Sequence, residues 1–508
     1  MNVSRRKLVV GSLAALAVAG TGMSFLRCYL ARSSLRASTN EFYRRLPVPQ
    51  LIDAREVANT VVISSMKGLV EFMEGFEAET YGYSAAYLGP AIRVHRGDTV
   101  AIKVMNELDI ATTVHWHGLF VPSDQDGGPY NLIAPGESWE PKLRIDQPAS
   151  TAWFHPQLYG GTGRQVYMGL AGIFYIEDES SRDLGLPSRY GVDDIPLVLQ
   201  DRSFGSAGEL EYDASPTAIM RGSRGDLAVI NGVIGPVAEV PKGIVRLRVL
   251  NAANARIFRL TFDDGRAMQV IAADNGFLSA PVTISELTIA PGERFEILVD
   301  FSDAEIAVLL TYPDHNGETP SGMSPLSRAI ADITDVLIPL VRFDPTDEIQ
   351  PVITSAPRKL ANLANAEADK TLKRHFFLLD PMAGANARFT EVESGLAAGM
   401  KMGINGKPFD KSRIDVTVNR GGKEIWEVHG SEMAHPFHIH GASFRILSLD
   451  GAPPPAHLSG PKDTVLITEA AELLISFDQV TDPAKPFVFH CDILEHQDAG
   501  MMAQYITM

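Results

Sequence analysis

The feature that most constrains the fold is a strand-turn-strand pattern that occurs three times along the chain. In its first copy, alternating apolar residues run from Ile92 to Val104 on both sides of the turn His95-Arg96-Gly97-Asp98. Alternation with a period of two is typical of half-buried strands. The pattern returns at 237–251 and at 414–428, and no long amphipathic helix stands out between the copies. The sequence therefore predicts an all-β protein.

Shorter sequence echoes indicate that the three copies mark three related domains. Ala-Pro-Gly-Glu occurs at 134–137 and 290–293, and Ile-Asn-Gly occurs at 230–232 and 404–406. Units of about 150 residues are whole domains, far longer than the repeats of a solenoid, and 508 residues are enough for about three of them. We place the domains at 42–180, 190–345 and 372–508, with a linker at 346–371.

The N-terminus has the pattern of an export signal. Arg5 and Arg6 precede a mildly apolar run from Leu8 to about Ala19, which resembles a twin-arginine signal. The run is shorter than the roughly 20 apolar residues that a membrane span needs. We therefore expect residues 1–41 to be a signal and leader read by the twin-arginine (Tat) export machinery. A periplasmic mature chain without an integral membrane span follows from this prediction.

Charge narrows the possible partners. The formal net charge is -17 at pH 7, and such an acidic surface repels nucleic acid and anionic membranes. A small or cationic substrate fits this charge better, and we expect a monomer.

The C-terminal stretch HCDILEHQDAGMM places Cys491, His496 and Met501 at five-residue intervals. The only other cysteine is Cys28, in or just after the signal, so Cys491 is better explained as a metal ligand than as half of a disulfide. Together with His435, these residues form the ligand set of a blue copper site, which has two imidazoles, a thiolate and a weak axial thioether. The chemistry that this set predicts is one-electron transfer.

Eight of the 13 histidines lie in four short clusters. Residues at positions i and i+2 of a strand project from the same face, so an HxH motif presents two imidazoles to one site. A lone HxH is usually a surface accident or a satisfied core pair, but four clusters in this order indicate metal binding. The clustered histidines are His115, His117, His155, His435, His438, His440, His490 and His496.

At these residues the chain resembles the three-domain multicopper oxidases, most closely their bacterial cuprous-oxidase branch. The resemblance covers nearly the whole chain after the signal. It implies three consecutive cupredoxin-like Greek-key β-barrel domains and copper as the cofactor. It also implies that electrons enter at a blue copper and reduce dioxygen at a trinuclear cluster between the first and third domains. The motifs that carry it are ATTVHWHGLFVP, DGGP, TAWFHP, TGRQVYMGLAG, INGKPFD, HPFHIHGASFRIL and LEHQDAGMM.

The resemblance assigns a metal role to each motif residue. It implies that electrons leave Cys491 through His490, and that Asp126 is an acidic residue beside the cluster. One type 3 copper has Asp492 where the family has a third histidine, and the other has Gln157. The implied ligands are His435, Cys491, His496 and Met501 for type 1 copper, His115 and His438 for type 2, and His117, His155, His440 and His490 for type 3.

A third departure is Gln497, where the cuprous-oxidase branch carries a glutamate that feeds protons to the cluster. All three departures concern dioxygen reduction, whereas the blue copper ligands are complete. Oxygen donors are harder than imidazole, and His117, His155 and Asp492 form a two-histidine, one-carboxylate set better known for Fe(II). Alternatively, Gln157 and Asp492 hydrogen-bond each other or water in a metal-poor cavity.

Evidence on the substrate is limited to methionines. Met433 matches a residue that helps bind substrate Cu(I) in the cuprous-oxidase branch, and a thioether suits that soft ion. Met382, Met400 and Met402 lie near the position of the branch's methionine-rich insert, which is missing here. Ordinary packing is the alternative for all of them.

The sequence therefore favours an exported copper-binding oxidoreductase of the multicopper oxidase type with a role in copper homeostasis. It takes single electrons from Cu(I) or a small phenolic donor and passes them to an altered site for dioxygen reduction. Two alternatives stay open. One is a blue-copper electron-transfer or copper-binding protein without full oxygen reduction. The other is a copper-poor scaffold that resembles the division-associated members of the family.

Overall fold

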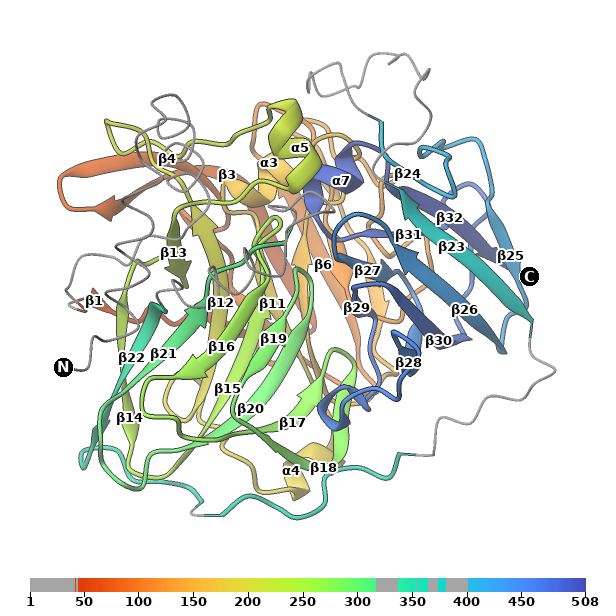
Figure 1. Ribbon diagram of the computed structural model, residues 1–508. Helices are drawn as coiled ribbons and strands as arrows, with labels where there is room; N and C mark the ends of the chain where they lie inside the picture. Colours follow the sequence, from red (N-terminus) through yellow and green to blue (C-terminus); the bar gives the residue numbers. More distant parts are fainter. Residues whose placement is uncertain (1–41, 43, 317–336, 354, 364–372, 381–400) are drawn as a thin grey trace, which may run out of the picture.

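The computed structural model describes residues 42, 44–316, 337–353, 355–363, 373–380 and 401–508. The predicted signal and leader, Cys28, Met382 and Met400 lie outside this part. The described residues form three pairs of β-sheets in chain order, drawn from orange through green to blue in Figure 1. The prediction of an all-β chain is confirmed.

The first sandwich packs a five-stranded sheet against a sheet built around β3 and β6. Along β6, Val100, Ile102 and Val104 are buried, and the residues between them are more exposed. The predicted alternation therefore marks the core face. One sheet contains β2 (Leu51–Asp53), β5 (Ala91–His95), β11 (Gly172–Glu177), β10 (Ser150–His155) and β7 (His115–His117); the other contains β4 (Phe76–Tyr83), β3 (Thr60–Met73), β6 (Thr99–Asn106), β8 (Ser138–Trp139) and β9 (Lys142–Arg144).

The second sandwich has two six-stranded sheets. Every residue of its strand β12 is buried because a further apolar cluster, which includes Trp153, Tyr175, Val198 and Leu250, packs the first sandwich against it. One sheet contains β13 (Leu227–Ile230), β12 (Asp194–Arg202), β15 (Ile244–Asn251), β20 (Arg294–Asp300), β17 (Met268–Ala273) and β18 (Gly276–Ile284); the other contains β1 (Arg44–Arg45), β14 (Pro236–Pro241), β22 (Ile338–Thr346), β21 (Ala307–Tyr312), β16 (Phe258–Phe262) and β19 (Leu287–Ile289).

The third sandwich encloses the core that contains Trp426, Phe437, Phe489 and Cys491, together with Met402. Met402 is fully buried there, so packing explains this methionine. One sheet contains β24 (Gly403–Ile404), β23 (Arg374–Asp380), β26 (Gly422–Gly430), β30 (Ala470–Phe477) and β28 (Ser443–Leu449); the other contains β25 (Val416–Val418), β32 (Met502–Thr507), β31 (Phe487–Cys491), β27 (His435–Ile439) and β29 (Thr464–Ile467).

The repeated strand-turn-strand pattern connects the two sheets of each sandwich. Strands β5 and β6 flank the tight turn at 95–98, where Asp98 N donates to His95 O at 3.1 Å, but they belong to different sheets. The same is true of β14 with β15 and of β25 with β26. Alternation shows that one face of a strand is buried, but it does not show which strand is the hydrogen-bonding neighbour.

Short helices lie in the connections between strands. Helices α3, α5 and α7 lie together at the top of Figure 1, where α7 contacts both of the others. Ser215 caps α5 by accepting from Ala218 N, and Pro216 opens the helix. No described helix has the length and apolar character needed to cross a bilayer. The helices are η1 (Ala54–Val57), α3 (Thr162–Tyr167), α4 (Glu179–Asp183), α5 (Pro216–Arg221), η2 (Ala456–Leu458) and α7 (Leu494–Asp498).

Candidate metal centre

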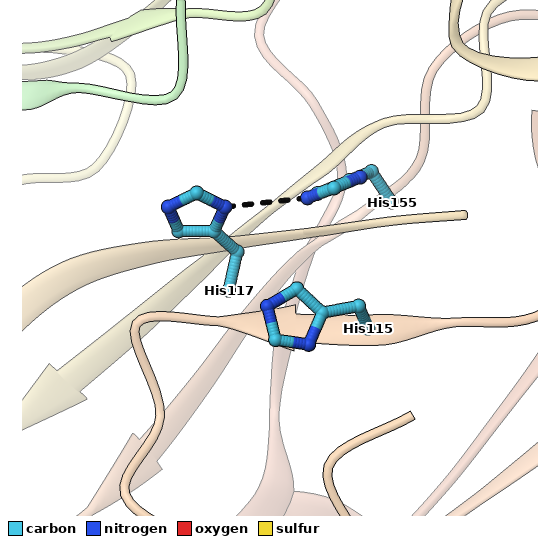
Figure 2. Close-up of side chains that lie close together, drawn as sticks. All are labelled: His115, His117 and His155. Atoms are coloured by element: carbon cyan, nitrogen blue, oxygen red, sulfur yellow. Dashed lines mark hydrogen bonds between the residues drawn. The ribbon is translucent and has the colours of Figure 1, made fainter. Parts of the chain in front are cut away.

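Strand pairing brings the first three histidines together. On β7, Trp116 is buried in the first core, so His115 and His117 project from the opposite face. The neighbouring strand β10 places His155 directly opposite His115. Figure 2 shows the three rings close to one another, with His117 Nδ1 directed at His155 Nε2.

The third sandwich contributes three further histidines in the same way. On β27, Phe437 and Ile439 point into the core, and His438 lies on the other face, opposite His490 of β31. His440 follows directly after the strand. We call the six residues from the two sandwiches the histidine cluster, and each is at most 1% exposed: His115, His117, His155, His438, His440 and His490.

The rings of the two sandwiches stack on one another in pairs. His115 stacks on His440 with the ring centroids 3.6 Å apart, and His117 stacks on His438 at the same distance. The Nε2 atoms of His115 and His438, the two predicted type 2 ligands, have no hydrogen-bond partner among the described residues. Two buried imidazole nitrogens are thus available to a cation.

The nitrogens of His440 and His490 are arranged as two ligands of one ion. His440 Nδ1 lies 2.7 Å from Asp126 Oδ2, and His490 Nδ1 lies 3.0 Å from Cys491 O. Both Nδ1 atoms therefore carry protons, and the Nε2 lone pairs face each other at 3.1 Å. Two nitrogens bound at about 2.0 Å and about 105° apart lie about 3.2 Å from each other. A shared metal ion fits this geometry.

His117 and His155 form an equivalent pair. His117 Nε2 lies 3.2 Å from Asp463 Oδ1 and 3.1 Å from Thr464 Oγ1. His155 Nδ1 lies 2.9 Å from Pro156 O. The lone pairs of His117 Nδ1 and His155 Nε2 consequently face each other at 3.3 Å. Both predicted type 3 pairs are therefore assembled with their metal-binding nitrogens directed at each other.

The predicted blue copper ligands also meet; we call His435, Cys491, His496 and Met501 the mononuclear site. Cys491 Sγ lies 3.5 Å from His435 Nδ1 and 3.6 Å from His496 Nδ1. The other ring nitrogens face the Ser431 and Met220 carbonyls at 3.2 and 3.1 Å. This leaves both Nδ1 lone pairs directed at the sulfur. Sulfur and nitrogen bound at about 2.3 and 2.0 Å lie about 3.6 Å apart, and Met501 is fully buried in the same core.

Burial sets the protonation of these ligands. Loss of hydration lowers the pKa of His435 to about 4 and that of His440 to about 3. Both rings are therefore neutral at neutral pH, which is the form that binds metal. Burial also raises the pKa of the Cys491 thiol well above its usual value. A cation that binds there must displace the thiol proton.

The two altered positions are both fully buried. A Cβ built on Gly292 would lie 1.8 Å from Asp492 Oδ2 and 3.2 Å from His117 Cε1, so the Asp492 carboxyl lies beside the His117 pair. Gln157 instead directs its Nε2 at Met502 Sδ, 4.0 Å away, and Met502 pairs with His490 across β31 and β32. The Asp492 carboxyl is also close to the other pair, with Oδ1 3.5 Å from His490 Nδ1.

Gln157 and Asp492 do not hydrogen-bond each other, so that part of the alternative interpretation is wrong. Asp492 Oδ1, Asp492 Oδ2 and Gln157 Oε1 accept no hydrogen bond within the described part of the chain. The Asp492 carboxyl has its Oδ1 3.5 Å from His490 Nδ1, whereas the Gln157 amide is directed at Met502 Sδ. Burial, reinforced by the charge of Asp463, raises the pKa of Asp492 well above its usual value.

The remaining residues predicted from the sequence are Asp126, Gln497 and Met433, and the structure describes the surroundings of each. Asp126 contacts two histidines of the cluster, with Oδ2 2.7 Å from His440 Nδ1 and 3.3 Å from His115 Nδ1. Gln497 is buried and donates to Thr162 Oγ1 at 3.1 Å, where α7 meets α3. Met433 is half-buried and packs against the core of the third sandwich.

Sequence reasoning missed Asp463. This residue directly precedes β29 and contacts His117, His438 and Arg294. The only sequence signal was the charged pair Lys462-Asp463 directly before an apolar strand. Such a pair is ordinarily exposed, whereas here both side chains are fully buried.

The chain matches known proteins over most of its length. Three family models described as multicopper oxidase match residues 66–181, 209–312 and 379–508. A relative from Xenorhabdus nematophila, named cell division protein FtsP, is 37% identical over 91% of this chain and 92% of its own. The FtsP of Escherichia coli K12 is 35% identical over 100% of this chain and 99% of its own.

Solved structures agree with these matches. The laccase-like multi-copper oxidase CueO from Ochrobactrum sp. is 45% identical, with a TM-score of 0.82 over 91% of this chain and 100% of that one. The Campylobacter jejuni multicopper oxidase, described as a metallo-oxidase, is 26% identical, with a TM-score of 0.75 over 93% of this chain and 98% of that one.

Proposed function

Because this chain belongs to the multicopper oxidase family, we propose that it is an exported, periplasmic oxidoreductase that passes single electrons from a donor to dioxygen. The donor is Cu(I) or a small phenol, and it reacts at the mononuclear site. Copper is the cofactor, and the fold is three consecutive cupredoxin-like Greek-key β-barrels, as the sequence predicted.

The observation that carries this proposal is the adjacency of Cys491 and His490 on β31. Cys491 belongs to the mononuclear site, and His490 belongs to the histidine cluster. The two residues are joined by the backbone, and a hydrogen bond of 3.0 Å from His490 Nδ1 to Cys491 O provides a second path between them. Bound copper supplies the one-electron couple at the mononuclear site and the redox chemistry of dioxygen at the cluster. The β31 backbone provides the route that connects the two sites.

The other residues prepare the cluster for this chemistry. Asp126 holds protons on the Nδ1 atoms of His115 and His440, which keeps their Nε2 atoms free for metal. Gln497 cannot release a proton, because a side-chain amide does not ionise; its amide instead donates a hydrogen bond to Thr162. Proton supply at this position therefore differs from that of the cuprous-oxidase branch.

The substitutions at Gln157 and Asp492 limit oxygen reduction more than electron entry. Each type 3 pair keeps two imidazoles and gains one oxygen donor in place of a third. Harder donors weaken copper binding relative to imidazole, whereas the mononuclear site retains all four predicted ligands. We therefore propose rapid electron acceptance and slow dioxygen reduction.

The relatives named cell division protein FtsP support a second candidate function. In that case the chain serves as a copper-poor scaffold in division, and the histidines are a remnant. The directed lone pairs at 3.1 and 3.3 Å favour the oxidoreductase, because facing lone pairs repel each other unless a cation or a proton lies between them.

Copper stoichiometry separates these functions. Protein exported and folded under copper-replete conditions is measured by native mass spectrometry, with Cys491→Ser as the control that lacks the blue ligand. Near four ions per chain supports the oxidoreductase with an occupied cluster. One or two ions would indicate a blue-copper electron carrier, and none would indicate the scaffold.

Export is tested separately at the N-terminus. We propose that Arg5 and Arg6 direct the chain to the twin-arginine machinery. Replacing both with lysine is expected to leave the chain in the cytoplasm, as measured by cell fractionation against the unaltered protein. Unchanged periplasmic recovery would contradict this part of the proposal.

A further inference from the structure

Each of the two stacked ring pairs in the histidine cluster has one carboxylate beside it. The carboxylate at the first stack belongs to Asp126. Its carboxylate lies 2.7 Å from His440 Nδ1 and 3.3 Å from His115 Nδ1. These two rings form one stack, with centroids 3.6 Å apart and planes 20° apart. One carboxylate thus contacts both rings of a stack that joins the first sandwich to the third.

Asp463 occupies the matching position at the other stack. Its Oδ1 lies 3.2 Å from His117 Nε2 and 3.4 Å from His438 Nδ1, and its backbone carbonyl accepts a hydrogen bond from His438 Nδ1 at 3.0 Å. Those rings stack with centroids 3.6 Å apart and planes 18° apart. Thr464 Oγ1 completes the arrangement at 3.1 and 3.0 Å from the same two nitrogens. Here the carboxylate comes from the third sandwich, whereas Asp126 comes from the first.

The second sandwich holds Asp463 in place. Arg294, at the start of β20, donates two parallel bonds to the carboxylate, 2.7 Å from Nη1 to Oδ1 and 2.6 Å from Nη2 to Oδ2. Asn275 Nδ2 adds a bond of 2.8 Å to Oδ2. A bidentate contact of this kind between a guanidinium and a carboxylate fixes the orientation of the carboxylate as well as its distance. Both charged side chains are fully buried, so little solvent screens the pair.

The charge of Asp463 is maintained by the same contact. The Arg294 guanidinium is always charged, and its two parallel bonds to the carboxylate leave both Asp463 oxygens as acceptors. Asp463 is therefore a fixed anion beside the two rings.

We propose that Asp463, locked by Arg294, is the positioning residue that sets the metal-facing nitrogens of His117 and His438. A proton held on His117 Nε2 leaves Nδ1 free to face His155, and a proton held on His438 Nδ1 leaves Nε2 free. His438 Nε2 indeed has no hydrogen-bond partner in the described chain. The inference rests on the proposed function, because those two nitrogens are the predicted ligands of two different coppers.

The second sandwich provides none of the predicted copper ligands, yet it controls the geometry of the cluster through this contact. Without the carboxylate, the His117 ring can shift its proton to the nitrogen that faces the metal, whereas the backbone carbonyl of Asp463 still accepts from His438 Nδ1 at 3.0 Å. Loss of such an outer partner typically costs about 10- to 100-fold in metal affinity. We expect a loss of that size in the cluster and no loss in the mononuclear site.

The test compares Asp463→Asn with Asp201→Asn. Asp201 pairs with Arg256 at 2.7 Å, and both side chains are about as buried as Asp463 and Arg294, but its carboxylate contacts Arg256 and Gly225 rather than a histidine. Each variant is titrated with copper and followed by electron paramagnetic resonance for type 2 copper and by the blue absorption band. Histidine ring ¹⁵N spectra of the metal-free proteins report which nitrogens carry protons.

The expected result is specific to Asp463→Asn. Its cluster binds copper about 10- to 100-fold more weakly, its blue band is unchanged, and the His117 ring spectrum changes in the metal-free protein, while the His438 ring keeps its backbone partner. If both variants melt earlier than wild type while copper affinity and ring spectra stay unchanged, Asp463 is merely structural and the proposal is refuted. If Asp463→Asn does not fold, Thr464→Val removes one partner from the His117 ring and must shift the His117 ring spectrum. Wild-type protein without cluster copper would refute the proposed function, and the ring spectra would still decide the role of Asp463.

Discussion

Replacing Gln157 with histidine is expected to strengthen copper binding by the His440 and His490 pair. Gln157 is fully buried, its Oε1 accepts no hydrogen bond from the described residues, and its Nε2 makes only a 4.0 Å contact with Met502 Sδ. The substitution therefore removes only this weak side-chain contact. The two existing nitrogens already face each other at 3.1 Å, so a third imidazole meets a preformed pair.

The size of the gain follows from the ligand count. Structural sites with four protein ligands bind their ion with about 10–16 kcal/mol, or roughly 3 kcal/mol per ligand. Since about 1.4 kcal/mol corresponds to a tenfold change, one added imidazole is worth roughly 100-fold in affinity. The backbone of Gln157 stays anchored because its N donates to Thr113 Oγ1 at 2.6 Å.

The assay is competition with a chelator of known copper affinity, combined with a copper count by native mass spectrometry. Gln157→Leu is the matched control, because leucine fills a similar space without offering a ligand. We expect the histidine variant to retain copper at chelator concentrations that strip wild type, and the leucine variant to lose it no later than wild type. Equal affinity of the histidine variant and wild type would show that position 157 does not face the metal, and the assignment of the pair would fail.

The remaining predictions concern the mononuclear site, the cluster and the second sandwich. Cys491→Ser should abolish the blue absorption band and any oxidase activity, and a band that persists would defeat the ligand assignment. Gln157→His combined with Asp492→His should raise oxygen consumption per donor oxidised; unchanged consumption and copper content would show that these positions do not limit the cluster. Burial would raise the pKa of Glu296, but two arginines of β15 outweigh it and lower the pKa to about 2. The resulting stabilisation, about 3 kcal/mol, is present above about pH 4.5 and is lost as the pH falls towards 2. Melting curves should therefore show a smaller loss of stability on acidification in Glu296→Gln, and parallel curves would contradict this.

Much of the fold was predictable because burial alternates along single strands. The residues Val100, Ile102 and Val104 are buried as their spacing predicts. The pairing of strands was not predictable in the same way, because β5 and β6 follow one tight turn yet lie in different sheets. Which strands become neighbours depends on how two layers pack, and period-two alternation carries no information about that.

The ligands were predictable for a related reason. An HxH motif on a strand presents both rings on one face, and this makes His115 with His117 recognisable from local spacing alone. The lack of a hydrogen bond between Gln157 and Asp492 was not predictable. The two residues belong to different sandwiches, so the distance between them depends on how those sandwiches pack. Asp463 was missed because a charged residue before a strand is ordinarily exposed, and only its pairing with Arg294 makes burial tolerable.

The sequence by itself determined the identity of the ligands, their spacing along each strand and the alternating burial that builds three sandwiches. These properties are local, since each depends on residues a few positions apart on one strand. Only the tertiary structure decided which rings stack, which nitrogens face each other and which carboxylate holds each proton. The ring stacks and the contact of His117 with Asp463 join residues more than 300 positions apart, so their distances depend on how whole sandwiches pack rather than on any motif.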